Sequence, residues 1–207
     1  MKKFELTAEF VTNVFGKKLF RIKALVAFGD VEKGELGGFI EKEDNLSHDG
    51  NAWVSGTAQV SGNAQVSGNA RVSGTAWVSG NAQVSGNARV SGTAWVSGNA
   101  QVSGNAQVSG NARVSGTARV SGTAWVSGTA RVSGDADYAV VAGFGRYFRT
   151  TTFFRCKDKI LRVQCGCFYG DLAQFREIVK KTHGDSKYAK EYLAIADLME
   201  LHFSDEC

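Results

Sequence analysis

Residues 51–74 read NAWVSG-TAQVSG-NAQVSG-NARVSG, and the same six-residue pattern continues to TARVSG at 129–134. Each hexad begins with Asn or Thr, continues with Ala, has Trp, Gln or Arg in third place, and ends in Val-Ser-Gly. Side chains alternate between the faces of a strand, so Ala and Val share one face and the other residues share the opposite one. Glycine then permits a turn that a β-carbon would hinder. Each hexad therefore predicts one short strand and one corner.

Three hexads close a triangular coil of 18 residues, and coils stack at the inter-strand spacing of roughly 4.8 Å. We interpret DADYAV at 135–140 as a degraded last copy. Residues 51–140 then predict a mainly β solenoid of about five coils, about 24 Å long. Val54 is followed four positions later by Ala58, and this spacing, repeated along the array, resembles the hexapeptide-repeat family. The resemblance implies a left-handed parallel β-helix.

Both ends of an open solenoid need a cap, because its terminal strands expose unpaired backbone groups. Residues 1–50 predict an N-terminal unit with two strands around Gly16-Lys17 and a capping coil at 33–50. In that coil, Ile40 and Leu46 continue at six-residue spacing the inward small position that begins at Ala52. The stretch from Phe28 to Val54 resembles the opening of prophage hexapeptide-repeat proteins, which are labelled acyltransferases or polymer-forming proteins.

Residues 141–207 predict a C-terminal α+β module of two strands and two helices, a ββαα unit. TTTFFRC and ILRVQCGCF are typical of a hairpin about residues 157–159. Asp171 and Gln174 form a capping-box pair at a helix start, Gly184 ends that helix, and Asp185 or Ser186 starts another. We expect these side chains on the inner helix faces: Leu172, Phe175, Ile178, Val179, Tyr188, Tyr192, Ile195, Leu198, Met199 and Phe203. The module resembles the tails of phage hexapeptide-repeat proteins.

Composition restricts location and partners. The first ten residues include two glutamates and no apolar segment, which argues against a secretory signal, and no apolar run is long enough to cross a membrane. We expect a cytoplasmic protein, in the host cell cytoplasm or in a virion if a phage encodes it. The net charge of +4 is weak evidence for a nucleic-acid partner.

Stacking every third hexad assigns the third-position side chains to the outer faces. The expected columns are Trp53, Arg71, Arg89, Gln107, Trp125; Gln59, Trp77, Trp95, Arg113, Arg131; and Gln65, Gln83, Gln101, Arg119, Asp137. Exposed tryptophan is typical of contact surfaces. We therefore predict that Trp53, Trp77, Trp95 and Trp125 form a binding face, against the alternative that repeat duplication placed them there without a role.

Catalysis is not expected. The acyltransferases of the hexapeptide-repeat family use a histidine base between solenoid subunits, whereas this chain has His48, His183 and His202, all outside the regular coils. We interpret His48 as a surface residue of the cap. Cys156, Cys165, Cys167 and His183 are kept as an alternative metal set, although their spacing differs from that of common zinc sites. We predict reduced thiols at these cysteines and at Cys207, no metal and no cofactor.

An anion site is the main alternative to a purely structural role. Arg146, Arg149, Phe154, Arg155 and Arg162 alternate with other aromatics, and such residues can fork to phosphate and stack on bases. The competing interpretation is a hairpin with one buried face and one basic, solvated face.

We therefore predict a non-catalytic structural or interaction protein, encoded by a phage or prophage. The solenoid would act as a rigid spacer and binding face, and the C-terminal module would dock or oligomerise. The alternatives are a module that captures a nucleotide or another anionic ligand, and an acyltransferase-like enzyme. Expected partners are further copies of the chain, a host or virion protein, or an anionic ligand, and no membrane.

Overall fold

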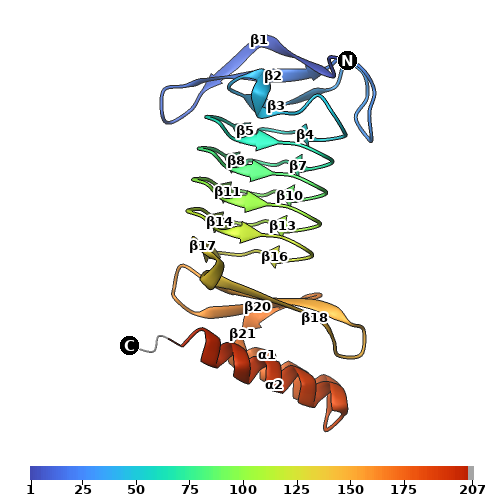
Figure 1. The fold of residues 1–207 in the computed structure, drawn as a ribbon, viewed down its shortest axis with the longest axis vertical. Coiled ribbons are helices and arrows are strands. Elements are labelled where there is room, and N and C mark those ends of the chain that lie inside the picture. The colour runs from blue at the N-terminus through green and yellow to red at the C-terminus, as the bar shows by residue number, and fades with distance from the viewer. Residues whose placement is uncertain (205–207) are drawn as a thin grey trace.

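The computed structural model describes residues 1–204 and shows a parallel β-solenoid between two capping units (Figure 1). The prediction of a mainly β chain with about five coils is confirmed. The left-handed path of the coils stays an implication of the family resemblance.

Each hexad of the array supplies one two-residue strand made of its third residue and its valine. A strand pairs in parallel with the strand 18 residues later, as Val60 with Val78 and Trp77 with Trp95, so the 18-residue coil is confirmed. The strands are β4 (Trp53–Val54), β5 (Gln59–Val60), β6 (Gln65–Val66), β7 (Arg71–Val72), β8 (Trp77–Val78), β9 (Gln83–Val84), β10 (Arg89–Val90), β11 (Trp95–Val96), β12 (Gln101–Val102), β13 (Gln107–Val108), β14 (Arg113–Val114), β15 (Arg119–Val120), β16 (Trp125–Val126) and β17 (Arg131–Val132).

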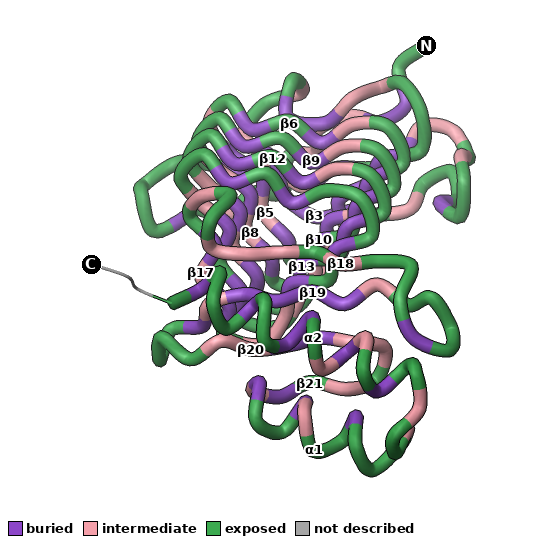
Figure 2. Tube along the Cα trace, turned by 60° about the horizontal axis from the view of Figure 1, so that its bottom comes forward, coloured by how far each residue is buried: buried purple, intermediate pink, exposed green. Residues whose placement is uncertain are grey.

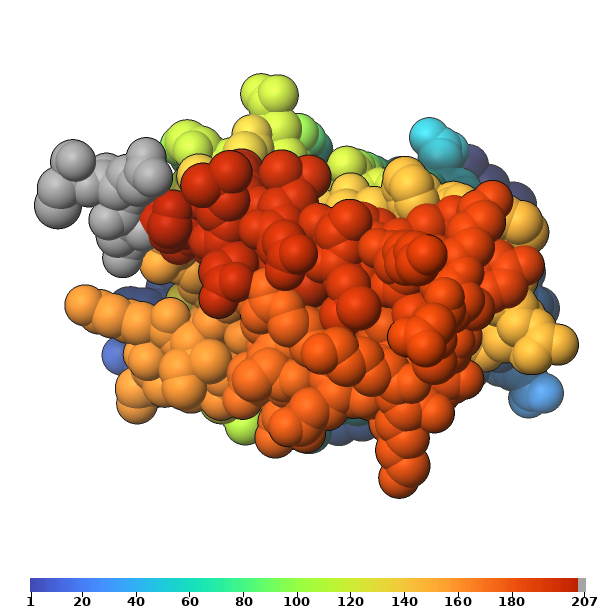
Figure 3. Space-filling view, turned by 90° about the horizontal axis from the view of Figure 1, so that it is seen from below, coloured from blue at the N-terminus to red at the C-terminus, as the bar shows by residue number. Residues whose placement is uncertain are grey.

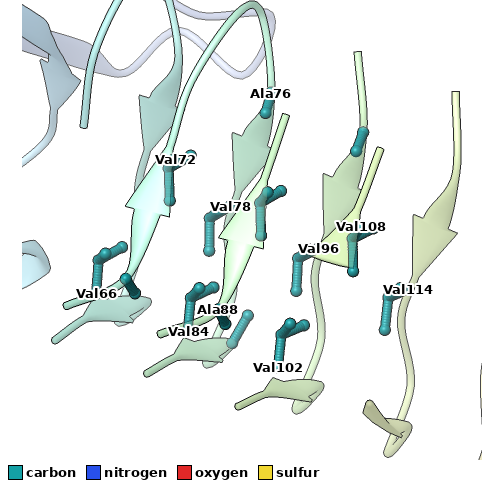
Figure 4. Close-up of a cluster of buried hydrophobic side chains, with 14 of the residues drawn as sticks. Val66, Val72, Ala76, Val78, Val84, Ala88, Val96, Val102, Val108 and Val114 are labelled. Carbon is teal, nitrogen blue, oxygen red and sulfur yellow. The ribbon is translucent and has the colours of Figure 1, made fainter. Parts of the chain in front are cut away.

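Alanine and valine fill the interior of the prism. Every one of them from Ala52 to Ala130 has no solvent exposure, and Figure 4 shows the valines and alanines of neighbouring coils stacked on one another. The two inward residues are small because three strands face one another across a narrow coil. Figure 2 shows the same pattern as buried segments that recur along each face. Burial of this repeated apolar surface is the main stabilising contribution.

The corners explain the invariant glycine of the hexad. Gly80, for example, has a φ of +70°, and a β-carbon there would lie 3.0 Å from the backbone nitrogen and oxygen of Gly98 in the next coil. Both the backbone conformation and the stacking distance therefore require glycine. The asparagines that follow these glycines form side-chain ladders between coils, as Asn81 Nδ2 donates to Asn99 Oδ1 at 3.0 Å.

The N-terminal cap continues one face of the solenoid. It contains β1 (Phe4–Thr12), β2 (Lys18–Ala24), β3 (Leu36–Ile40) and the 3-10 helix η1 (Glu43–Asn45). β1 and β2 pair antiparallel around the predicted turn, and β3 pairs with β2 on one side and in parallel with β5 on the other.

One detail of the predicted capping coil is wrong. Ile40 and Leu46 pair with Val60 and Val66, so they extend the valine columns and not the alanine column. The reason is an irregular corner, since Leu46 and Val54 are eight positions apart where the regular array has six.

The C-terminal module has a larger sheet than predicted. It contains η2 (Asp135–Asp137), β18 (Tyr138–Phe144), β19 (Arg149–Arg155), β20 (Leu161–Cys165), β21 (Phe168–Asp171), α1 (Leu172–His183) and α2 (Lys187–His202). The hairpin of β19 and β20 is confirmed, but β18 and β21 flank it in an antiparallel sheet ordered β18-β19-β20-β21. Residues 135–140 are therefore not a further hexad. Tyr138 is too large for a valine position, and Val140 stands where the corner needs glycine.

Both predicted helix starts and the glycine stop are confirmed. The Asp171 carboxylate accepts from Gln174 N, the Ser186 hydroxyl accepts from Ala189 N, and α1 ends at Gly184. Three residues expected on the inner faces are exposed, namely Ile178, Tyr188 and Leu198. The small sheet covers only one side of the helix pair, and α1 and α2 form the outer surface of this end of the molecule (Figure 3). None of the helices in residues 1–204 is long and apolar enough to cross a membrane.

Candidate functional site

The first coil needs hydrogen-bond donors from outside the array. In the regular coils, each backbone carbonyl of Ala accepts from an N–H one coil earlier, as Ala76 O accepts from Gln59 N. Above the first coil, Phe39 N still donates to Ala58 O, but side chains serve the other two alanine carbonyls. The Lys3 ammonium donates to Gly50 O and Ala52 O at 3.3 and 3.0 Å, and Asn45 Nδ2 donates to Gly62 O and Ala64 O at 3.1 and 2.8 Å.

Burial has an electrostatic consequence for Lys3. Its side chain lies in the cap with the residue only 3% exposed. Burial, and next the nearby charge of Arg71, lower the pKa of Lys3 from 10.5 to about 8. The lysine nevertheless keeps its hydrogen bonds to the first coil in either protonation state, because a neutral amine still has N–H groups.

The last coil has the opposite requirement, because its N–H groups need acceptors. Asp135 Oδ1 accepts from Arg119 N at 2.9 Å, and Thr152 Oγ1 accepts from Trp125 N at 3.0 Å. Asp137 accepts from the backbone and hydroxyl of Ser133, so it belongs to the cap and not to the predicted third column. Burial raises the pKa of Asp137, but the hydrogen bonds from Ser133 and Gly134 outweigh it and hold the pKa below its usual value.

Trp77 and Trp95 share one face, as predicted, and stack on each other. Their ring centroids are 5.0 Å apart with an interplanar angle of 6°, and the Arg113 guanidinium lies 4.7 Å from the Trp95 ring centroid. Each ring is half-buried because its neighbours cover it. The stack runs along β8, β11 and β14, and its role in binding stays a prediction.

The expectation that Trp53 lies on an exposed face is wrong. It is 1% exposed, and Phe28 from the loop between β2 and β3 packs edge-on against its ring at 5.4 Å. That loop folds over the first coil, which the hexad pattern alone does not show. Trp125 is 37% exposed and donates through Nε1 to Ser109 Oγ at 3.4 Å.

A polar groove of about 950 Å³ runs along the face that carries β4, β7, β10 and β13. Arg71, Arg89 and Gln107 line it beside corner asparagines, and Asp30 closes one end through an ion pair with Arg71. Burial, and next the charge of Arg89, lower the pKa of Arg71. The hexad repeat predicts that Arg71 and Arg89 lie in one column. The part of the groove lined by Gly29 and Asp30 depends on the fold of the N-terminal loop, which the repeat does not show.

The predicted anion residues separate in the structure. Phe154 is fully buried against the end of the solenoid and offers no ring to a ligand, which corrects that assignment. Arg162 pairs with Asp158 at 2.9 Å, and Arg155 donates to Phe203 O at 2.8 Å. Arg146 and Arg149 remain together, with their guanidinium carbons 5.5 and 5.1 Å from the Tyr147 ring centroid.

The alternative metal set is not assembled. Within residues 1–204, no group of three or more His, Cys, Asp or Glu side chains is placed to hold a metal ion. Cys156 is buried at the junction with the solenoid, whereas Cys165, Cys167 and His183 line a pocket beside Arg146 and Arg149. The described cysteines are free thiols, and Cys207 lies outside the described residues.

His48 has the cap role that the sequence indicated. Its Nδ1 accepts from Lys3 N at 3.1 Å, and its ring stacks on Phe4 at 4.3 Å. The residue therefore fastens the start of the chain to the first coil.

The comparison with protein families agrees with a structural role. Residues 52–143 match the model of the bactofilin family, described as polymer-forming cytoskeletal. The match spans the solenoid from its first alanine to β18. No curated protein matches the chain. The hexapeptide-repeat and phage resemblances stay predictions.

Proposed function

We propose that this chain is a non-catalytic structural protein of the cytoplasm that polymerises end to end. The match of residues 52–143 to a polymer-forming family carries the proposal. The solenoid supports it physically, because its coils are joined by continuous backbone hydrogen bonds and form a stiff rod. The phage origin predicted from the sequence is kept as a prediction.

The N-terminal end offers a strand edge for pairing. β1 is the terminal strand of the sheet that runs down to β17, and it pairs only with β2 within the described chain. Its free edge faces away from the solenoid along the long axis (Figure 1). Unpaired strand edges are templates for a further strand, and two identical strands pair antiparallel about a two-fold axis. We infer that two N-terminal ends join through β1.

The other end offers an apolar helix surface. Leu198 and Leu201 of α2 are 56% and 63% exposed, and Tyr188 lies on the same helix. We infer that this surface contacts the same surface of another copy. Alternation of the two contacts gives a filament with the solenoids along its axis, in which the stacked Trp77 and Trp95 face outward for lateral contacts or a partner.

A proline in β1 tests the proposal. Residues 7–9 have no partner in β2, because the register shifts between Leu6 and Phe10. Ala8→Pro therefore removes an N–H from the free edge without removing a rung of the intramolecular ladder, and Ala8→Val is the matched control that keeps the N–H. Sedimentation should show polymers for the control and species no larger than dimers for Ala8→Pro. Polymers of unchanged size in a folded Ala8→Pro variant would contradict the role of β1.

A further inference from the structure

We propose that the pocket between the β18–β19 turn and α1 binds a small aromatic anion, with Arg146 and Arg149 holding its carboxylate or phosphate group. The residues that line this pocket are different from those of the proposed polymer contacts. The pocket has a volume of about 190 Å³, and its lining combines two arginines with several apolar and aromatic side chains. The chain thus has a ligand site in addition to its structural role.

The arginines are available for a ligand. Among the residues that the structure describes, neither Arg146 nor Arg149 forms an ion pair, and both side chains gather around Tyr147. The position of Arg149 is fixed by the opposite turn, since a β-carbon on Gly166 would lie 2.5 Å from its Nη1. The nearby Glu191 carboxylate accepts from Gly145 N at 2.9 Å and pairs with neither arginine. Two neighbouring guanidinium groups without an ion-pair partner are suited to a shared oxyanion.

The floor of the pocket fits one aromatic ring. Phe168, Phe175, Val179 and Tyr192 line it, and the Tyr192 hydroxyl lies 3.4 Å from Phe144 O. Burial, and next the Cys165 thiol, raise the pKa of Tyr192 to about 12, so the phenol stays neutral beside a bound anion. A dry cavity of roughly 150 Å³ accepts a benzene-sized ring, and this pocket is slightly larger.

The turn above the pocket has the features of a binding loop. Phe148 has a φ of +52°, an uncommon conformation for a bulky residue, and it is 72% exposed together with Tyr147 at 62%. Its N–H donates to Gly145 O, so the left-handed residue closes the hairpin turn and sets the positions of Tyr147 and Arg149 beside it. Residues 144–149 therefore place the Tyr147 ring and both arginines at one small pocket, and the ligand that suits this lining is an aromatic ring with an anionic group.

Calorimetric titration of the full chain tests the site with three probes: phenyl phosphate, benzoate and the neutral benzyl alcohol. We expect saturable binding of at least one anion, at least about tenfold tighter than the alcohol, because a charge-assisted hydrogen bond is worth roughly that much. The better anion then identifies the head group. Thr182→Trp, at an exposed position of the pocket lining, should abolish binding of that anion by filling the space.

Arg149→Gln and Arg162→Gln form the matched pair. Arg149→Gln should weaken binding of the anion about tenfold and leave binding of the alcohol unchanged. Arg162→Gln should change the affinity for neither probe by more than about twofold, because Arg162 already pairs with Asp158. Equal losses in the two variants, unchanged binding in folded Thr182→Trp, or no saturable binding of either anion at millimolar concentration would each overturn the proposal.

Discussion

Lys3 and Asn45 donate to Ala52 O and Ala64 O of the first coil hydrogen bonds that backbone N–H groups supply in the later coils. At the other end Asp135, Asp137 and Thr152 supply acceptors. The two sets have opposite chemistry because a parallel stack ends in free carbonyls on one side and free N–H groups on the other. Apart from Asp137, which accepts from nearby Ser133, the sequence does not reveal these roles, since the partners lie far apart along the chain and only the coil geometry brings them together.

Lys3 should give the chain a distinctive pH dependence. A lysine whose folded pKa is about 8, below its ordinary 10.5, binds fewer protons in the folded state between these values. The free energy of unfolding should therefore rise with pH through this window, by at most about 1.4 kcal/mol per pKa unit. Chemical denaturation at pH 7.5 and 9.5 should show this rise for the wild type relative to Lys3→Met. A constant difference between the two proteins would contradict the lowered pKa.

Asn45 should matter more than any ladder asparagine. Asn45→Leu removes the donor from the buried Ala64 O and the part-buried Gly62 O, and we expect a loss of about 2–4 kcal/mol in the free energy of unfolding. Asn81→Leu removes only solvent-exposed contacts and should cost less than about 1 kcal/mol. Urea unfolding of the two variants measures both values, and equal losses would show that Asn45 is not a cap.

At the scale of elements, regular patterns were predictable and exceptions were not. Alternation and glycine spacing gave every strand from β4 to β17, and capping residues gave α1 and α2. The prediction that Trp53 is exposed was wrong because the loop with Phe28 covers its ring. The prediction that Phe154 can contact a ligand was wrong because the end of the solenoid packs on β19. β18 was missed because its first residues still resemble a hexad. Each error comes from a contact between segments that no local period records.

The 18-residue coil predicts how the tryptophan stack responds to deletions. Removing the hexad 81–86 places Gln101 next to Trp77, and so separates the two rings without changing either. Removing the full coil 99–116 leaves both rings stacked. Both proteins should fold with similar stability, because coils add nearly independently. The exciton signal of coupled indoles in circular dichroism should vanish in the first and remain in the second, and the reverse would refute the coil length.

At the scale of the whole molecule, the rod carries a different structural feature on each of its surfaces. Its ends carry β1 and α2, its sides carry the Trp77–Trp95 stack and the polar groove, and the small pocket lies in the C-terminal module. The sequence indicated the rod and the tryptophan face. It could not indicate the pocket, because Arg149, Gly166 and Val179 come together only when the sheet and α1 pack.

Lateral contacts should depend on the tryptophan stack alone. Replacing Trp77 and Trp95 by Gln, which the repeat carries at Gln59, removes apolar surface from one face and keeps the backbone unchanged. We expect filaments of normal length in electron micrographs, with lateral association or partner binding weakened at least about tenfold, the equivalent of roughly 1.4 kcal/mol. Bundles as frequent as in the wild type would show that the rings have no contact role.

The axial repeat of the filament tests the central claim, which is end-to-end assembly of capped solenoid rods. Cryo-electron microscopy of filaments from the wild type and from the variant without residues 99–116 measures it directly. With two subunits per repeat, the deletion should shorten the repeat by about 10 Å, twice the inter-strand spacing of roughly 4.8 Å, and the reflection at that spacing should lie along the filament axis. A repeat that does not change, or a reflection perpendicular to the axis, would contradict the account.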